Sequence, residues 1–334
     1  MMDEMNTEIM CIRLGNVHLI IPINSPEIAV EFLKKQDAVF SSRPVILSAE
    51  ITSRGYRTMV ITSMGEQWKK MRRVLTSEVL SGRRHQWLQG KRAEEADHLV
   101  KFVHNQSTDS TKGGVVNVRV VAQHFCRNVM RKIIFSKRFF GNGRADGGPG
   151  VEEEEHVNAM FTILSRLYDF SASDYIPFLR GHVDLESREK ILKMATASVA
   201  KYQDPKVDER IREWTKATRT EQDDLLDILI GLKQNDGSPL LSPEEMKAQI
   251  VELMIASVDN PSNTVERALA EMINQLATLE RAIEELDRVV GNHRLVQESD
   301  RSQLNYVKSC VREAFRLYPV LPFNVCLTEI LDLN

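Results

Sequence analysis

Three groups of residues have the types and the spacing to do chemistry, and the first lies midway along the longest apolar pattern of the chain. There the acid Asp259 and the amide Asn260 are followed directly by Pro261. A proline in a helix interior has no backbone N–H to donate to the carbonyl four residues earlier, here Ser257, so a break or kink is expected. Small side chains at Ala256 and Ser257 leave room for a bound group, and Asp259 could deliver protons to it. The alternative is a kink only, with Asp259 hydrogen-bonded beside the broken turn.

The second group is a tryptophan and an arginine four residues apart, Trp68 and Arg72. Residues at this spacing share one face of a helix, so an indole N–H and a guanidinium could bind one carboxylate together. Lys69, Lys70 and Arg73 make the same segment strongly basic. The alternative is a basic surface helix with one buried tryptophan.

The third group is the pair Glu313 and Arg316, three residues apart in a helical pattern. The apolar stripe of that helix consists of Leu304, Val307, Val311, Phe315 and Tyr318. The pair faces away from the centre of this stripe, so periodicity predicts an exposed ion pair of small energetic value.

One long helix, over 242–275, must position the first group. Ser242 can cap its N-terminus, Pro243 suits the first helical position, and Glu245 completes a capping box. Apolar residues then recur at steps of three and four. At 1.5 Å per residue the helix would be about 50 Å long, enough to cross a whole domain.

The rest of the chain is predicted to be mainly α with a small β portion near the N-terminus. A hairpin is expected from strands 8–14 and 17–22, and a further strand at each of 59–62 and the segment beginning at Val115. Glu152–Glu155 is expected to be a solvated first helical turn. One further helix is predicted to begin at Ser25, and another to follow the strand at Val115 and end at Phe135. The remaining predicted helices span 65–80, 86–104, 160–167, 187–211, 221–234, 279–290 and 304–318. With no clear linker, 1–334 is interpreted as a single domain.

Composition excludes several classes of protein. The net charge of −3 and the lack of a basic stripe argue against nucleic-acid binding. Four scattered cysteines, Cys11, Cys126, Cys310 and Cys326, have no CxxC spacing, and no HExxH occurs, so no metal site is predicted from either motif. Neither a signal peptide nor an apolar run of about 20 residues is present.

The order of the three groups along the chain resembles the cytochrome P-450 superfamily of haem-thiolate monooxygenases. Trp-x-x-x-Arg, a kinked long helix with a central acid, and Glu-x-x-Arg before Leu-Tyr-Pro occur in that order. Supporting stretches are 284–291 (EELDRVVG) and 304–308 (LNYVK). The segment 256–263 (ASVDNPSN) and Phe323-Asn324 resemble the plant branch that N-hydroxylates amino acids to aldoximes, in glucosinolate, cyanogenic glucoside and related pathways.

The resemblance implies a role for each group. Trp68 and Arg72 would hold a haem propionate, and Glu313 with Arg316 would be a buried structural pair near the haem. Asp259 would be the distal acid, with Asn260 where most members have a threonine, as in the aldoxime-forming branch. Ala256, Ser257 and Pro261 would lie near the oxygen and the substrate. The implied partners are an amino-acid substrate and an NADPH-cytochrome reductase, which the basic helix at Lys69–Arg73 would face.

The resemblance also predicts a truncated cytochrome P-450 fold. The N-terminal membrane anchor and the Phe-x-x-Gly-x-Arg-x-Cys haem-ligand segment of the family are not among the 334 residues, and 325–334 depart from the family pattern. We do not expect Cys326, ten residues after Arg316, to be the axial ligand, because the family places a sheet region before that cysteine. The family location is the endoplasmic reticulum membrane, whereas the chain as written would be cytosolic.

Three hypotheses follow. The protein is an aldoxime-forming monooxygenase, a non-catalytic product of a truncated gene with at most an interaction role, or, if the resemblance is accidental, an unrelated helical scaffold. Haem binding would exclude the third.

Overall fold

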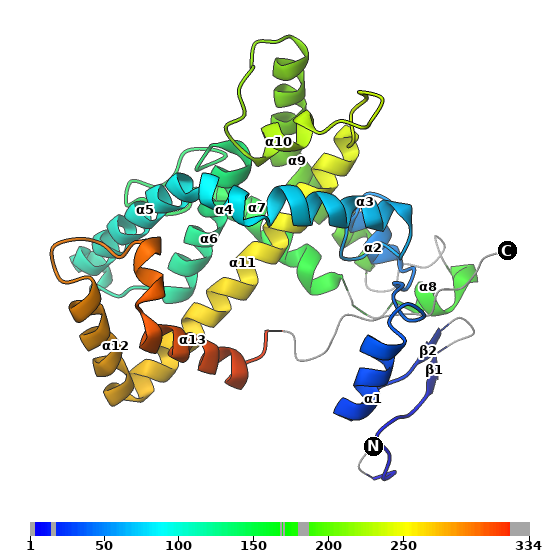
Figure 1. The fold of residues 1–334 in the computed structure, drawn as a ribbon, viewed down its shortest axis with the longest axis horizontal. Helices are drawn as coiled ribbons and strands as arrows, with labels where there is room; N and C mark the ends of the chain where they lie inside the picture. Colours follow the sequence, from blue (N-terminus) through cyan, green and yellow to red (C-terminus); the bar gives the residue numbers. More distant parts are fainter. Residues whose placement is uncertain (1–3, 15–17, 168, 170, 180–186, 321–334) are drawn as a thin grey trace.

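The computed structural model describes residues 4–14, 18–167, 169, 171–179 and 187–320. The predictions for Phe323-Asn324, Cys326 and 325–334 lie outside the described residues. A long helix, α11 (Pro243–Asn274), runs diagonally through the molecule and contacts α6 (Val118–Phe135), α7 (Val151–Arg166) and α9 (Arg188–Thr215) (Figure 1). The small β portion and α1 lie at one end, and α12 and α13 lie at the other.

The described part is almost entirely helical. The longer helices are α3 (Glu66–Val74), α5 (Gln89–Thr108), α6 (Val118–Phe135), α7 (Val151–Arg166), α9 (Arg188–Thr215), α11, α12 (Leu276–Val289) and α13 (Asn305–Leu317). Shorter α-helices are α1 (Pro26–Val30), α2 (Leu47–Thr52), α4 (Gly82–Trp87), α8 (Ala172–Tyr175) and α10 (Leu225–Gly231). Single turns of π- or 3-10 helix are η1 (Glu31–Lys35), η2 (Leu75–Val79), η3 (Ser110–Lys112), η4 (Pro177–Leu179) and η6 (Glu298–Ser302).

The only sheet among the described residues is a two-stranded antiparallel ribbon. It pairs β1 (Ile12–Leu14) with β2 (His18–Ile20), in a register that sets Arg13 opposite Leu19. The expectation of a mainly α chain with a small β portion near the N-terminus is therefore confirmed.

Helix α11 begins and ends within one residue of the predicted bounds. Ser242 accepts a hydrogen bond from the backbone N–H of Glu245, whose carboxylate accepts one from Ser242 N–H at 2.8 Å. This reciprocal capping satisfies two of the donors that a helix N-terminus leaves unpaired, so the start is determined locally. Helicity continues through Pro261, so the proline does not end the helix.

The core lies where α11 crosses α6, α7 and α9. Ile250 and Met254 of α11 are fully buried there, together with Ile163 of α7 and Val199 of α9. Among the described residues no helix is both long enough and apolar enough to cross a bilayer.

Two predicted strands are wrong. Residues 59–62 form bends rather than a strand, and the helix of α6 follows directly after Asn117, which caps it by accepting from Val120 N–H at 3.1 Å. In both places β-branched residues favour a strand, but the described residues supply no partner strand, and the backbone donors bond to side chains instead.

The prediction of a solvated turn at Glu152–Glu155 is wrong for one residue. Glu153 is 1% exposed and forms an ion pair with the equally buried Arg131 of α6. The segment does lie in the first turn of α7, but the side chain of Glu153 points into the core. The carboxylate stays charged there because a guanidinium and a histidine face it.

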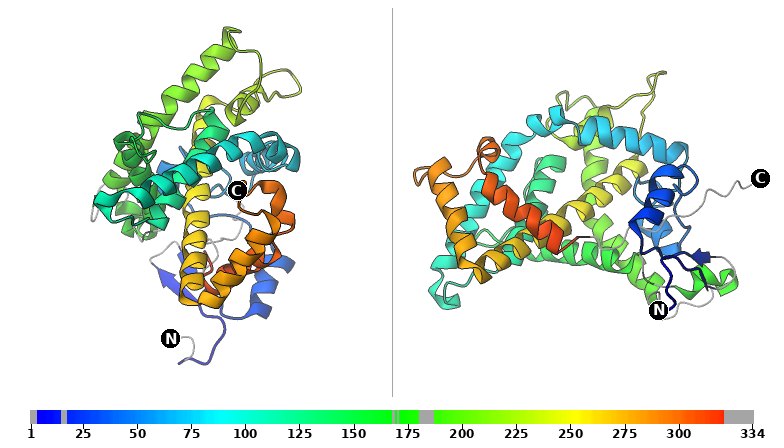
Figure 2. Two further views of the ribbon diagram at one scale, coloured as in Figure 1. Left: turned by 90° about the vertical axis from the view of Figure 1, so that its left-hand side faces the viewer. Right: turned by 60° about the horizontal axis from the view of Figure 1, so that its bottom comes forward.

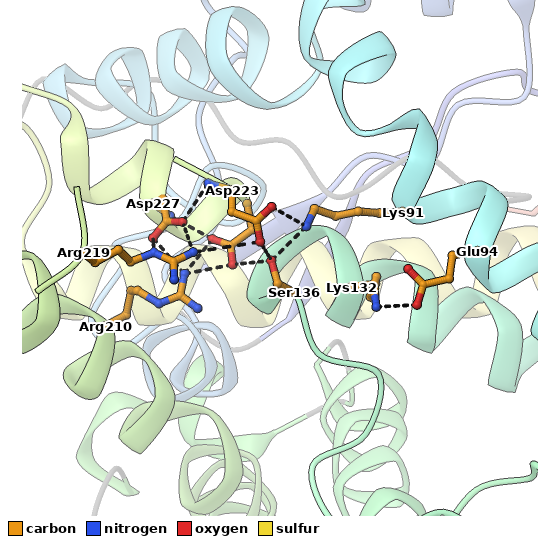
Figure 3. Close-up of polar contacts among 9 residues, drawn as sticks. Lys91, Glu94, Lys132, Ser136, Arg210, Arg219, Asp223 and Asp227 are labelled. Atoms are coloured by element: carbon orange, nitrogen blue, oxygen red, sulfur yellow. Dashed lines mark hydrogen bonds and ion pairs between the residues drawn. The ribbon is translucent and has the colours of Figure 1, made fainter. Parts of the chain in front are cut away.

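A second polar network attaches α10 to its neighbours (Figure 3). Arg210 of α9 donates to Asp224 and Asp227, and Arg219 donates twice to Asp227 at 2.6 and 2.8 Å. Ser136, at the C-terminus of α6, donates to Asp224 at 3.0 Å. This network fixes where α10 begins and holds it against α6 and α9.

Candidate distal face and propionate site

The candidate distal face consists of Ala256, Asp259, Asn260 and Pro261, midway along α11. Ala256, Asn260 and Pro261 are exposed and Asp259 is half-buried, whereas the neighbouring Val258 is buried. Periodicity therefore puts the apolar side of α11 in the core and leaves this small polar face open.

Hydroxyl and amide groups bond to the helix backbone around Pro261. Ser257 Oγ donates to the carbonyl of Leu253, Ser262 Oγ donates to that of Val258 at 2.6 Å, and Asn260 Nδ2 donates to that of Ala256 at 3.5 Å. Such bonds to carbonyls one turn earlier accompany local bending of a helix. All three acceptors belong to α11 itself, and none of them is the Ser257 carbonyl, which has no backbone donor at Pro261.

Trp68 and Arg72 share one face of α3, as predicted. The guanidinium carbon of Arg72 lies 5.3 Å from the centroid of the Trp68 ring, a cation–π arrangement. Met71 and Val74 on the opposite side of the helix are buried, so Arg72 is directed outward and is exposed. Within the described residues neither the Trp68 indole N–H nor the Arg72 guanidinium has a hydrogen-bond partner, which leaves both donors available to an added carboxylate.

The basic segment around them is not one continuous exposed face. Lys70 is half-buried and forms an ion pair with Glu245 of α11, and Lys69 pairs with Glu66 in solvent. The Lys70–Glu245 contact holds α3 across the N-terminal half of α11, so this lysine has a structural function.

Glu313 and Arg316 form the exposed pair that periodicity predicts. Their closest atoms are 2.6 Å apart, and the side chains are 53% and 67% exposed. The expectation of a buried pair, which came from the family resemblance, is wrong for this structure, because no element among the described residues covers this side of α13. No described contact joins the pair to Trp68, Arg72 or the distal face.

The described cysteines are free thiols on separate elements. Burial raises the pKa of Cys126 on α6 to about 11, and burial also raises that of Cys310 on α13. Both therefore stay protonated at neutral pH and act as packing residues. The described residues contain no group of three or more His, Cys, Asp or Glu side chains arranged for a metal ion.

Sequence reasoning missed a small apolar gap between α7 and α11, with room for about one water molecule. Its lining consists of Val157, Met160, Phe161, Leu164, Met254, Ile255 and Val258. The only sequence signal for it is the three- and four-residue spacing of these side chains, which also describes an ordinary helix–helix contact.

The described part of the chain is a helical protein organised around one long helix, α11, and α3, which carries the Trp68 indole and the Arg72 guanidinium, is joined to that helix by the Lys70–Glu245 ion pair. Comparison with known families names the class: residues 2–330 match the family Cytochrome P450. The chain belongs to this family.

Similar proteins are named as N-monooxygenases of different amino acids. The chain is 54% identical to valine N-monooxygenase 1 of Manihot esculenta over 97% of its length, and 54% identical to the tyrosine N-monooxygenase of Sorghum bicolor over 99%. It is 53% identical to a tryptophan N-monooxygenase of Prunus mume. The matches cover 59%, 59% and 62% of those proteins, so the chain spans about three-fifths of the length of these relatives.

Solved structures confirm the fold. A zebra fish cytochrome P450 solved with progesterone superposes with a TM-score of 0.72 at 21% identity, covering 97% of this chain and 71% of that one.

Haem is the cofactor of this family, and the residues present fit its polar edge. An indole N–H and a guanidinium without partners in the described structure are the donors that a propionate carboxylate needs.

Proposed function

We propose that the protein takes part in haem-dependent N-hydroxylation of an amino acid to its aldoxime. The observation that carries this proposal is the 49–55% identity to proteins named as N-monooxygenases of valine, isoleucine, phenylalanine, tyrosine and tryptophan. Haem supplies oxygen activation in this chemistry when it is bound. Residues 1–334 would act as a single structural unit of such an enzyme.

In this proposal each candidate residue has a defined task. Trp68 and Arg72 hold a propionate and fix the plane of the ring. Asp259 and Asn260 hold and move protons on the distal side, and Ala256, Ser257 and Pro261 shape the space for oxygen and the amino acid. Electrons would come from an NADPH-cytochrome reductase at the endoplasmic reticulum membrane. Lys69 and Arg73 are the basic side chains beside Arg72 that could face this reductase.

A second candidate is a non-catalytic product. It is favoured by the exposure of Glu313 and Arg316.

One experiment separates the two candidates. The purified chain is loaded with haem and divided into two samples. One sample is reduced and exposed to CO. The other is incubated with NADPH, the reductase and each of the five amino acids. A thiolate-type Soret shift with aldoxime formation would support the monooxygenase and make Cys326 the first residue to replace. Haem uptake without the shift, in folded protein, would support the non-catalytic candidate.

A further inference from the structure

The segment between α2 and α3, residues 53–65, has an unfavourable backbone that its own sequence does not explain. Arg54, Gly55 and Tyr56 are consecutive residues with positive φ, at 55°, 83° and 58°. Only the glycine adopts such angles without steric cost. Non-glycine residues with positive φ, such as Arg54 and Tyr56, persist where contacts with surrounding residues hold the backbone in that conformation.

Those contacts come largely from carboxylates, most of them on the N-terminal half of α11. Arg54 forms ion pairs with Glu244 of α11 at 2.8 Å and with Asp204 of α9 at 2.7 Å. Lys70, in the middle of α3, which follows the segment, pairs with Glu245 of α11. The segment is therefore held on both sides of its middle.

The middle of the segment is held by Glu252. One carboxylate oxygen accepts the backbone N–H of Val60 at 2.8 Å, and the other accepts that of Met59 at 3.2 Å. The buried Gln249 donates to the same carboxylate at 2.9 Å, and Arg43 Nε donates to the Val60 carbonyl at 3.0 Å. The peptide at 59–60 is thus hydrogen-bonded from both sides.

Glu252 lies one turn before Ala256 and two turns before Asp259, so it belongs to the same face of α11 as the candidate distal face. Trp68 is eight positions after Val60, on the helix that begins at Glu66. A carboxylate at 252 therefore connects the distal face to the segment that leads into the propionate site.

We infer that Glu252 is a positioning residue that sets α3, with Trp68 and Arg72, relative to the distal face of α11. A carboxylate suits this task because each of its two oxygens can accept from one N–H, and adjacent peptide N–H groups offer two parallel donors. A glutamine would present one oxygen and one NH₂ group, so one backbone N–H would lose its acceptor. The position of α3 is measurable without haem, whereas its consequence for haem binding rests on the proposed function.

The test uses Glu252→Gln and Glu252→Asp in the full chain, with Glu266→Gln as the matched control. Glu266 also lies on α11 and also accepts from two donors, the Arg119 Nε and Nη2 at 2.6 and 3.0 Å. Unlike Glu252, it makes no described hydrogen bond to residues 53–65. The first readout is amide hydrogen exchange of peptides covering 57–64. The second is the haem dissociation constant from Soret titration.

Glu252→Gln is expected to speed exchange of the Met59 and Val60 amides about tenfold or more, with the midpoint of urea unfolding close to that of Glu266→Gln. Haem affinity should fall in the same variant, and Glu252→Asp should restore part of both properties. Unchanged exchange at 57–64, or equal acceleration in Glu266→Gln, would overturn the inference. Accelerated exchange with unchanged haem affinity would keep the contact but refute its connection to the propionate site. If Glu252→Gln fails to fold, Glu252→Asp alone decides by the same readouts.

Discussion

Arg131 and Glu153 form an ion pair 2.5 Å long in which both side chains are 1% exposed. His124 Nδ1 lies 3.2 Å from the same carboxylate oxygen, and Arg131 also lies over the Phe140 ring, 4.6 Å from its centroid. The pair joins α6 to α7, two of the helices that pack on α11. Removing one partner of a charged pair at this depth would leave the other charge buried without compensation, and would therefore destabilise the fold.

The first prediction is that Glu153→Gln destabilises the chain by about 3–5 kcal/mol, since it leaves the Arg131 guanidinium buried beside a neutral group. Urea unfolding followed by circular dichroism measures the change. The exposed pair of Arg119 and Glu266 provides the control, and Glu266→Gln should change the unfolding midpoint little. Equal midpoints for the two variants would contradict the prediction.

The second prediction concerns His156, which is fully buried beside Arg131 and Gln203. Burial, and then the charges of Arg131 and Arg127, lower the pKa of His156 to about 2. The unfolded chain has an ordinary histidine pKa near 6.5, so below that pH the unfolded state binds a proton that the native state does not. Stability should therefore be fully present above about pH 6.5 and decline as the pH falls, by at most about 1.4 kcal/mol per pH unit from this group.

Unfolding free energies measured from pH 8 to pH 5 check this slope. His156→Gln should flatten it, and His104→Gln, which changes an exposed histidine of α5, should leave it as it is. Glu153 does not obscure the effect. Burial would raise the pKa of Glu153, but His124 and Arg131 outweigh burial and lower it, so its contribution is lost only in more acidic solution.

The third prediction concerns Asp227, whose carboxylate is fully buried and accepts from Arg210, Arg219 and the indole N–H of Trp214. Burial alone would raise the pKa of Asp227, but the hydrogen bonds from Arg219 and Trp214 lower it well below its usual range. Asp227→Asn should cost about 3 kcal/mol, because two guanidinium groups lose their shared anion.

The change should also shift the fluorescence of Trp214 before global unfolding, because the indole loses its acceptor. Asp223→Asn is the matched control, since Asp223 lies in the same network (Figure 3) but is 57% exposed. A small stability change in Asp227→Asn, similar to that of Asp223→Asn, would refute the prediction.

The fourth prediction is that Arg72→Ala weakens haem binding about tenfold or more while the unfolding midpoint of the haem-free chain stays nearly constant. A charge-assisted hydrogen bond to a propionate is lost, but the side chain is exposed and has no described hydrogen bond to another residue. Soret titration and urea unfolding measure the two quantities. Arg73→Ala, which removes the adjacent exposed guanidinium, should leave haem affinity unchanged; an equal loss in both variants would indicate only a general effect of charge.

Signals that act within one turn of helix were sufficient to predict much of the fold, whose largely helical character is visible in two further views (Figure 2). The start of α11 follows from Ser242, Pro243 and Glu245, because capping is a contact between residues three apart. The shared face of Trp68 and Arg72 and the exposed pairing of Glu313 with Arg316 follow from the 3.6-residue period alone.

Only the tertiary structure decided which charged side chains are buried. No local sequence signal distinguishes Glu153 from Glu152 and Glu154. Only Glu153 of these three is buried, because Arg131 of α6 faces it. Residues 59–62 have the composition of a strand but bond to Glu252, 192 residues from Val60. The energy of such contacts depends on partners that are distant in sequence, and no periodicity within a single segment contains that information.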